Sequence, residues 1–184
     1  KHVFTYWPYP DTIMHETGCY SYETIENIKS INKAVEEMCK NLRDTLVIIS
    51  ADHGLIDSEE NIYINAVPEL HECLIMPPFI EPRCASFFVK PDKKEQFKSN
   101  FIARYGEDFI LFTREEVIGK GILGYGKGNK KTDDFLGDFL ASAIGNKCIK
   151  FRAYTSTCLQ EFKGNHAGLT WKEMMVPLIT IECG

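Results

Sequence analysis

Residues 21–43 carry an amphipathic pattern that runs almost directly into a wholly apolar segment, residues 46–49. Apolar side chains recur in the first segment at the spacing of a helix: Ile25, Ile28, Ile31, Ala34, Val35, Met38 and Leu42. Ser21 is suited to cap the start of that helix, and the apolar run is typical of a strand covered on both faces. Because residues 2–7 also resemble a strand, the order strand, helix, strand predicts an α/β fold with a parallel sheet covered by helices.

The part of the chain after Gly54 has a different character. A proline-rich passage leads to short strand-like segments and to one helix-like segment, residues 93–105, for which Asp92 and Glu95 form a predicted capping box. We interpret residues 67–155 as an α+β insert within a larger fold. The expected strands from here to the end of the chain are residues 62–64, 85–90, 109–112, 139–144 and 178–181.

The composition excludes several classes of function. The 184 residues suit one domain, and a net charge of −5 disfavours nucleic-acid binding, which requires a basic face. No stretch approaches the roughly 18 apolar residues of a membrane span, so no membrane partner is expected. The seven cysteines are an odd number without a Cys-x-x-Cys pair, which disfavours a disulfide framework and a structural zinc knuckle. Reduced thiols predict a cytoplasmic protein.

Side chains suited to metal binding occur in two short motifs of the first third of the chain. In "PDTIMHETG", Asp11 and His15 lie four positions apart, so on a helix both project to the same side. In "LVIISADHG", Asp52 and His53 directly follow the apolar run. Adjacent residues of a strand point to opposite faces, and these two converge only if the chain turns at once, which Gly54 permits.

A third motif, "KGNHAGLT", places His166 in a loop of small residues before a predicted helix. Open α/β sheets bind ligands at the carboxyl ends of their strands, and carboxylate and imidazole groups suit zinc or manganese. Each motif alone is more often a solvated turn, a helix cap or a surface ion pair. Together they favour a metal site, whereas His2 and His71 have no such neighbours and are interpreted as structural.

Two other segments carry weaker signals. Residues 121–128 (GILGYGKG) nearly fit a phosphate-binding loop, but Gly128 stands where that loop needs a Ser or Thr, and no buried strand leads into it. Thr155, Ser156 and Thr157 offer hydroxyl groups without a recognisable base nearby. We interpret both segments as loops without a catalytic role.

The three metal-binding motifs, in this order, resemble the alkaline phosphatase superfamily, and specifically its type I phosphodiesterase/nucleotide pyrophosphatase branch. Members carry a Y-x-x-P-D-x-x-x-H-x-x-G segment, a strand that ends in S-D-H-G, and a late G-x-H-G-G-L-T-x-x-E-M-x-V-P-L-I segment. The corresponding segments here are "YWPYPDTIMHETG", "ISADHG" and "GNHAGLTWKEMMVPLI", and "LFTREEVIGKGILGYG" resembles the insert of bacterial members. The resemblance covers nearly the whole chain and matches the C-terminal half of the family's catalytic domain.

This resemblance implies a partial three-layer αβα sandwich, with residues 1–184 as a single partial catalytic domain. It also implies a hydrolase of phosphoric esters that uses two divalent ions, with zinc expected and manganese as the alternative. Three of the motif residues would hold one ion and two the other. The first set is Asp11, His15 and His166, and the second is Asp52 and His53.

The chain departs from the family pattern in two respects. The family's nucleophilic Ser or Thr and one further metal-binding Asp have no counterpart in these motifs, so we expect both upstream of Lys1 and expect these 184 residues alone to be inactive. Ala167 replaces the glycine that usually follows the third histidine, where glycine would permit unusual torsions. An incomplete sheet leaves an exposed edge, through which self-association is expected.

Three hypotheses for function remain open from the sequence. The first is a hydrolase of phosphodiester or nucleotide pyrophosphate bonds, acting on a small phosphate ester or nucleotide. The second is a cofactor-independent phosphomutase, because such mutases share the superfamily's metal site. The third is a non-catalytic binding module that retains the fold. The "GLTWKEMMVPLI" ending favours the hydrolase.

Overall fold

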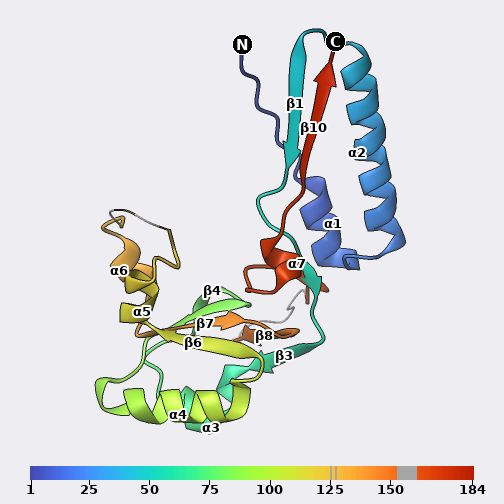
Figure 1. Ribbon diagram of the computed structural model, residues 1–184. Helices are drawn as coiled ribbons and strands as arrows, with labels where there is room; N and C mark the ends of the chain where they lie inside the picture. Colours follow the sequence, from blue (N-terminus) through green and yellow to red (C-terminus); the bar gives the residue numbers. More distant parts are fainter. Residues whose placement is uncertain (125, 127, 153–160) are drawn as a thin grey trace. The chain divides into compact units, whose positions relative to one another are not determined.

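The computed structural model describes residues 1–124, 126, 128–152 and 161–184, which form two compact units (Figure 1). The first unit comprises Lys1–Asp57, Gln160–His166 and Trp171–Gly184, and the second comprises Ser58–Leu159 and Ala167–Thr170. The hydroxyl segment predicted to be a polar loop, Thr155, Ser156 and Thr157, lies outside the described residues. The interpretation of residues 67–155 as an insert within a single domain stays a prediction.

The first unit combines helices with two short pairs of strands. Its elements in chain order are α1 (Tyr9–Thr17), α2 (Tyr22–Lys40), β1 (Thr45–Ser50), β2 (Ile56–Asp57), β9 (Gly164–Asn165), α7 (Trp171–Met174) and β10 (Leu178–Cys183). Strands β1 and β10 are antiparallel neighbours, as are β2 and β9. In Figure 1, α2 runs alongside the β1–β10 pair.

Helix α2 begins where the sequence predicts. The Ser21 hydroxyl accepts a hydrogen bond from the backbone N–H of Thr24 at 3.0 Å, which satisfies one of the helix's unpaired donors. The Thr24 hydroxyl in turn donates to the Gly18 carbonyl oxygen at 2.8 Å, and Thr24 is fully buried. These bonds make the junction between α1 and α2 a closely packed turn.

The prediction of a parallel sheet with strand 46–49 covered on both faces is wrong. Within the described residues β1 pairs only with β10, and it does so antiparallel. Its burial alternates: Leu46 and Ile48 are 57% and 61% exposed, while their neighbours are partly buried. A two-stranded ribbon with a helix on one side has one bare face. Residues 2–7, predicted as a strand, form no regular secondary structure.

The second unit contains a four-stranded antiparallel sheet in the order β4-β5-β7-β6, together with a parallel pair, β3 and β8. Its elements are β3 (Glu60–Tyr63), η1 (Ile64–Ala66), α3 (Pro68–His71), β4 (Phe79–Glu81), β5 (Cys84–Phe87), η2 (Pro91–Lys93), α4 (Lys94–Tyr105), β6 (Phe109–Thr113), α5 (Arg114–Gly119), α6 (Thr132–Phe135), β7 (Phe139–Ala143) and β8 (Lys147–Lys150). The core is aromatic, with Phe87 and Phe101 of facing elements both fully buried.

Most elements predicted for this region are present, but one capping prediction is wrong. Helix α4 begins at Lys94 with no side-chain cap, because Asp92 lies in the short 3-10 helix η2 that precedes it. A capping box instead starts α5, where Thr113 and Glu116 bond each other's backbone N–H groups. Within the described residues, no helix combines the length and apolar character that a membrane span needs.

Candidate metal centre

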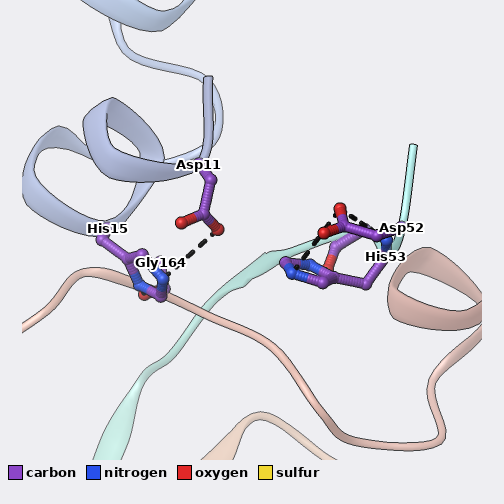
Figure 2. A network of polar contacts seen from close by, with 6 residues as sticks. Asp11, His15, Asp52, His53 and Gly164 are labelled. Atoms are coloured by element: carbon purple, nitrogen blue, oxygen red, sulfur yellow. Dashed lines mark hydrogen bonds and ion pairs between the residues drawn. The ribbon is translucent and has the colours of Figure 1, made fainter. Parts of the chain in front are cut away.

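Helix α1 presents Asp11 and His15 on the same side, as their spacing predicts. Nε2 of His15 lies 3.4 Å from Oδ1 of Asp11. Pro10 stands in the first turn of the helix, where its missing N–H costs no hydrogen bond, and the helix ends at Gly18. Figure 2 shows both side chains extending from α1 toward the segment that contains Gly164.

The tautomer of His15 follows from its second ring nitrogen. Nδ1 lies 2.8 Å from the carbonyl oxygen of Gly164, which can only accept, so Nδ1 carries the proton. In neutral His15 the Nε2 lone pair therefore faces the Asp11 carboxylate. Two electron-pair donors at this distance repel each other unless a cation or a proton lies between them.

His166 follows β9 and brings the other two motifs together. Its ring centroid lies 5.2 Å from that of His15 and 3.9 Å from that of His53, on which it is stacked. Single ligand atoms of Asp11, His15 and His166 all lie within 4.8 Å of one another. Residues 155 positions apart in the chain, from 11 to 166, thus share one small region of the first unit.

Asp52 and His53 lie at the end of β1, beside this group (Figure 2). Nδ1 of His53 is 3.2 Å from the carbonyl oxygen of Gly54 and so carries the proton, which leaves the Nε2 lone pair of the neutral ring available. This Nε2 atom lies 3.8 Å from Oδ1 of Asp52. The two side chains therefore converge, as predicted for the second pair of ligands, and the Asp52 carboxylate is largely exposed.

Gly54 is needed for a different reason from the one predicted. Its φ lies outside the left-handed region, so conformational freedom is not the requirement. A Cβ atom at this position would lie 2.0 Å from the carbonyl oxygen of Lys172, and the Gly54 N–H donates to the Glu173 carbonyl oxygen at 2.8 Å. The glycine thus lets α7 approach the turn that carries His53.

Ala167, which stands where the family pattern has glycine, has a φ of +78°. This is the left-handed region, which disfavours a residue with a Cβ atom. The backbone torsions suited to glycine are therefore kept in this chain at the residue directly after His166.

A divalent cation fits the group formed by Asp11, His15 and His166. Oδ1 of Asp11 is buried and has no hydrogen-bond partner among the described residues, although buried polar atoms are normally paired. One carboxylate and two imidazoles also match the number and type of ligands in catalytic zinc sites, which keep a fourth position open. The His15 bond to Gly164 supplies the outer hydrogen bond that fixes a ligating imidazole.

Two contacts of this site were not predicted from the sequence. The Gly164 carbonyl orients His15, and the Phe162 ring lies 4.8 Å from the His15 ring. A backbone carbonyl and a single phenylalanine carry no motif signal, so only the fold reveals them.

Comparison with known proteins identifies a family and a fold. The family of type I phosphodiesterases/nucleotide pyrophosphatases matches residues 1–149. No curated protein sequence matches the chain.

Several solved structures share the fold. Murine ectonucleotide pyrophosphatase/phosphodiesterase 5, an inactive variant in complex with AMP, is 16% identical with a TM-score of 0.70, covering 94% of this chain and 45% of its own. The human counterpart is 18% identical with a TM-score of 0.67, covering 95% and 45%. Phosphonoacetate hydrolase from Sinorhizobium meliloti 1021, with phosphonoformate, is 19% identical with a TM-score of 0.62, covering 92% and 43%. The chain thus spans less than half the length of each of these proteins. The similarity confirms the predicted fold class, an α/β fold that forms part of an alkaline-phosphatase-like domain.

Proposed function

The chain belongs to the type I phosphodiesterase/nucleotide pyrophosphatase family, and from this membership and the geometry of its histidine site we propose that the protein is a metal-dependent hydrolase of phosphodiester or nucleotide pyrophosphate bonds. The solved relatives in complex with AMP and phosphonoformate support a small phosphorus-containing anion as the substrate. An acidic chain with a net charge of −5 needs added positive charge to bind such an anion, and metal ions supply it.

The group formed by Asp11, His15 and His166 carries this proposal. The three residues would hold the first ion, with His15 oriented by the Gly164 carbonyl and Asp11 contributing the buried oxygen that has no hydrogen-bond partner in the described chain. Zinc held by these residues, or manganese as the alternative, would supply a Lewis acid for the phosphoryl group of the substrate.

Asp52 and His53 are proposed to hold a second ion. His53 offers an Nε2 lone pair, because its Nδ1 proton is donated to the Gly54 carbonyl, and the Asp52 carboxylate lies beside it. Two ligands from one loop hold an ion weakly, so these 184 residues are expected to bind one ion tightly, at the three-ligand group.

Metal stoichiometry measured by calorimetry on the purified chain tests the site. We expect about one tightly bound zinc or manganese ion per chain, as the three-ligand group requires. His166→Ala removes one of these ligands and should abolish tight binding. His53→Ala is the matched control, because it removes the stacked neighbouring ring and leaves the three ligands intact. Equal loss of binding in both variants would contradict the assignment.

An activity assay tests the reaction class. We expect the 184-residue chain to hydrolyse a chromogenic phosphodiester at no better than the background rate, because no motif in it corresponds to the family's nucleophile. Robust turnover by the chain alone would show that the nucleophile lies within it, with residues 155–157 the first to be substituted. Transfer of phosphate within a sugar phosphate, without hydrolysis of the diester, would support the phosphomutase instead.

A further inference from the structure

We propose that Asp57 is a positioning residue that holds helix α1, and with it Asp11 and His15, against strand β9. The inference rests on the proposed metal site. Asp57 lies outside the three motifs, and the hydrogen bonds of its side chain described below involve none of the proposed ligands. Asp57 ends β2, is exposed to solvent, and directly joins two segments that approach the site from different parts of the chain.

The first join is to the end of α1. Oδ1 of Asp57 accepts a hydrogen bond of 2.7 Å from the backbone N–H of Cys19. The Cys19 thiol also donates to this carboxylate, and partial burial together with this bond raises the pKa of the thiol to about 12. The thiol thus remains protonated and acts as a second donor. A charged acceptor makes each of these bonds stronger than a bond between neutral groups.

Gly18 makes this close contact sterically acceptable. Its φ of +102° is in a region open to glycine, and a Cβ atom there would lie 3.2 Å from Oδ1 of Asp57. The Gly18 N–H closes α1 on the Met14 carbonyl, and its own carbonyl accepts from Thr24. The carboxylate therefore binds at a rigid turn rather than at a loose end of the helix.

The second join is through the strand. Asp57 is the register partner of Gly164 in the β2–β9 pair, and the Gly164 carbonyl is the group that accepts from His15 Nδ1. A Cβ atom on Gly164 would lie 2.5 Å from the carbonyl oxygen of Met14, so the strand lies directly against α1. The N–H of Lys163, the residue directly before β9, donates to the His15 carbonyl oxygen at 2.8 Å, which adds a backbone bond between α1 and this segment.

These contacts link three parts of the first unit to one another. The Asp57 side chain bonds Cys19 at the end of α1, His15 of α1 bonds the Gly164 carbonyl, and Gly164 pairs with Asp57 in the β2–β9 pair. Metal ligands tolerate misplacement of only about half an ångström. Because the Asp57 bonds hold α1 in place against β9, they should increase the affinity of the first metal site. Without the Asp57 carboxylate, the His15–Gly164 bond is the one of these side-chain hydrogen bonds that still links α1 to β9. The expected result is a weaker first metal site with unchanged stoichiometry.

The test is a Co²⁺ titration of the full 184-residue chain, followed by visible absorption, which reports the ligand geometry. Asp57→Ala should weaken Co²⁺ binding by roughly 10- to 100-fold, the usual effect of removing a group that orients a ligand. Asp57→Asn keeps an acceptor for the Cys19 N–H and should bind close to the unsubstituted chain. Glu16→Ala is the matched control: it removes one exposed carboxylate from α1 and should bind Co²⁺ normally.

A second readout does not depend on metal. In the apo protein, ¹⁵N NMR of the imidazoles should show His15 with its proton on Nδ1, and the Cys19 amide should be protected from hydrogen exchange. Asp57→Ala should mix the two tautomers and remove this protection, and Asp57→Asn should restore both. If the unsubstituted chain binds no Co²⁺, the proposed function fails while this readout still decides the role of Asp57.

An Asp57→Ala variant with unchanged Co²⁺ affinity, an unchanged His15 tautomer and a protected Cys19 amide would overturn the inference. If that variant does not fold, Asp57→Ser replaces it, because its shorter side chain does not reach the Cys19 N–H. The expected changes and the contradicting result are then the same.

Discussion

At the scale of single residues, Ala167 shows where the chain retains strain beside the site. A φ of +78° costs a residue with a Cβ atom roughly 1–2 kcal/mol in the folded state. Glycine removes this cost, but it also gives the unfolded chain more conformational entropy, which lowers stability by roughly 0.4–1 kcal/mol. Ala167→Gly should therefore raise the free energy of unfolding by roughly 0.5–1 kcal/mol, measured by chemical denaturation. Ala167→Val should act in the opposite direction, and an equal effect of the two substitutions would contradict the torsional explanation.

Gly54 carries a second prediction at this scale. Alanine here would place Cβ 2.0 Å from the Lys172 carbonyl oxygen, so the turn carrying His53 and helix α7 would have to separate. Gly54→Ala should destabilise the fold by roughly 1–3 kcal/mol, as overpacking does. Gly119→Ala is the control, because a Cβ atom there meets no other atom within 4 Å. Denaturation midpoints of the two variants measure the difference.

At the scale of elements, the capping box of α5 predicts a dependence of stability on pH. The pKa of Glu116 is lowered from 4.5, first by the Thr113 backbone N–H that its carboxylate accepts and then by nearby Lys120. A carboxylate whose pKa is lower in the folded state stabilises the fold above its unfolded pKa, and this contribution is lost as the pH falls through the folded pKa. Helix α5 buries Val117, so the effect reaches the smaller apolar cluster that Val117 forms with Leu136 and Leu140 in the second unit.

The corresponding experiment compares Glu116→Gln with the unsubstituted chain. The variant should be less stable at neutral pH, and its stability should fall less steeply between about pH 5 and pH 3, because the titrating carboxylate is gone. Thr113→Ala removes the other half of the box and should cost about 1 kcal/mol. Parallel pH profiles for Glu116→Gln and the unsubstituted chain would exclude this role of the carboxylate.

At the scale of the whole molecule, the β1–β10 pair leaves large apolar side chains on one face open to solvent. Leu46, Ile48 and Leu178 are 57%, 61% and 75% exposed, and the strand register puts them on the same face. Large apolar side chains exposed together on one face promote association. We therefore expect the 184-residue chain to self-associate, with a sedimentation coefficient that rises with protein concentration.

Ile48→Lys tests whether this face is responsible, because a charge at its centre should lower the association measured by sedimentation velocity. Ser30→Lys is the control for the added charge, since Ser30 is an exposed polar residue of α2. A chain that sediments as a monomer at every concentration would contradict the expectation.

Local features of this chain were predictable because their causes are local. The four-residue spacing of Asp11 and His15 follows from the period of a helix, and Ser21 caps α2 with a neighbour three residues away. The strand at 45–50 is evident from its apolar residues alone. The family pattern, carried by short motifs, is equally a property of the linear chain, and the match of the family to residues 1–149 includes the first two of these motifs.

Tertiary structure alone decided how these pieces meet. The partner of β1 is β10, which begins more than a hundred residues later, and the period of an apolar run does not distinguish a parallel from an antiparallel neighbour. The tautomer of His15 depends on the carbonyl of Gly164, and the stacking of His53 on His166 depends on how β9 pairs with β2. Such contacts join residues that any one stretch of sequence leaves unrelated, because the chain brings them together only when its elements pack.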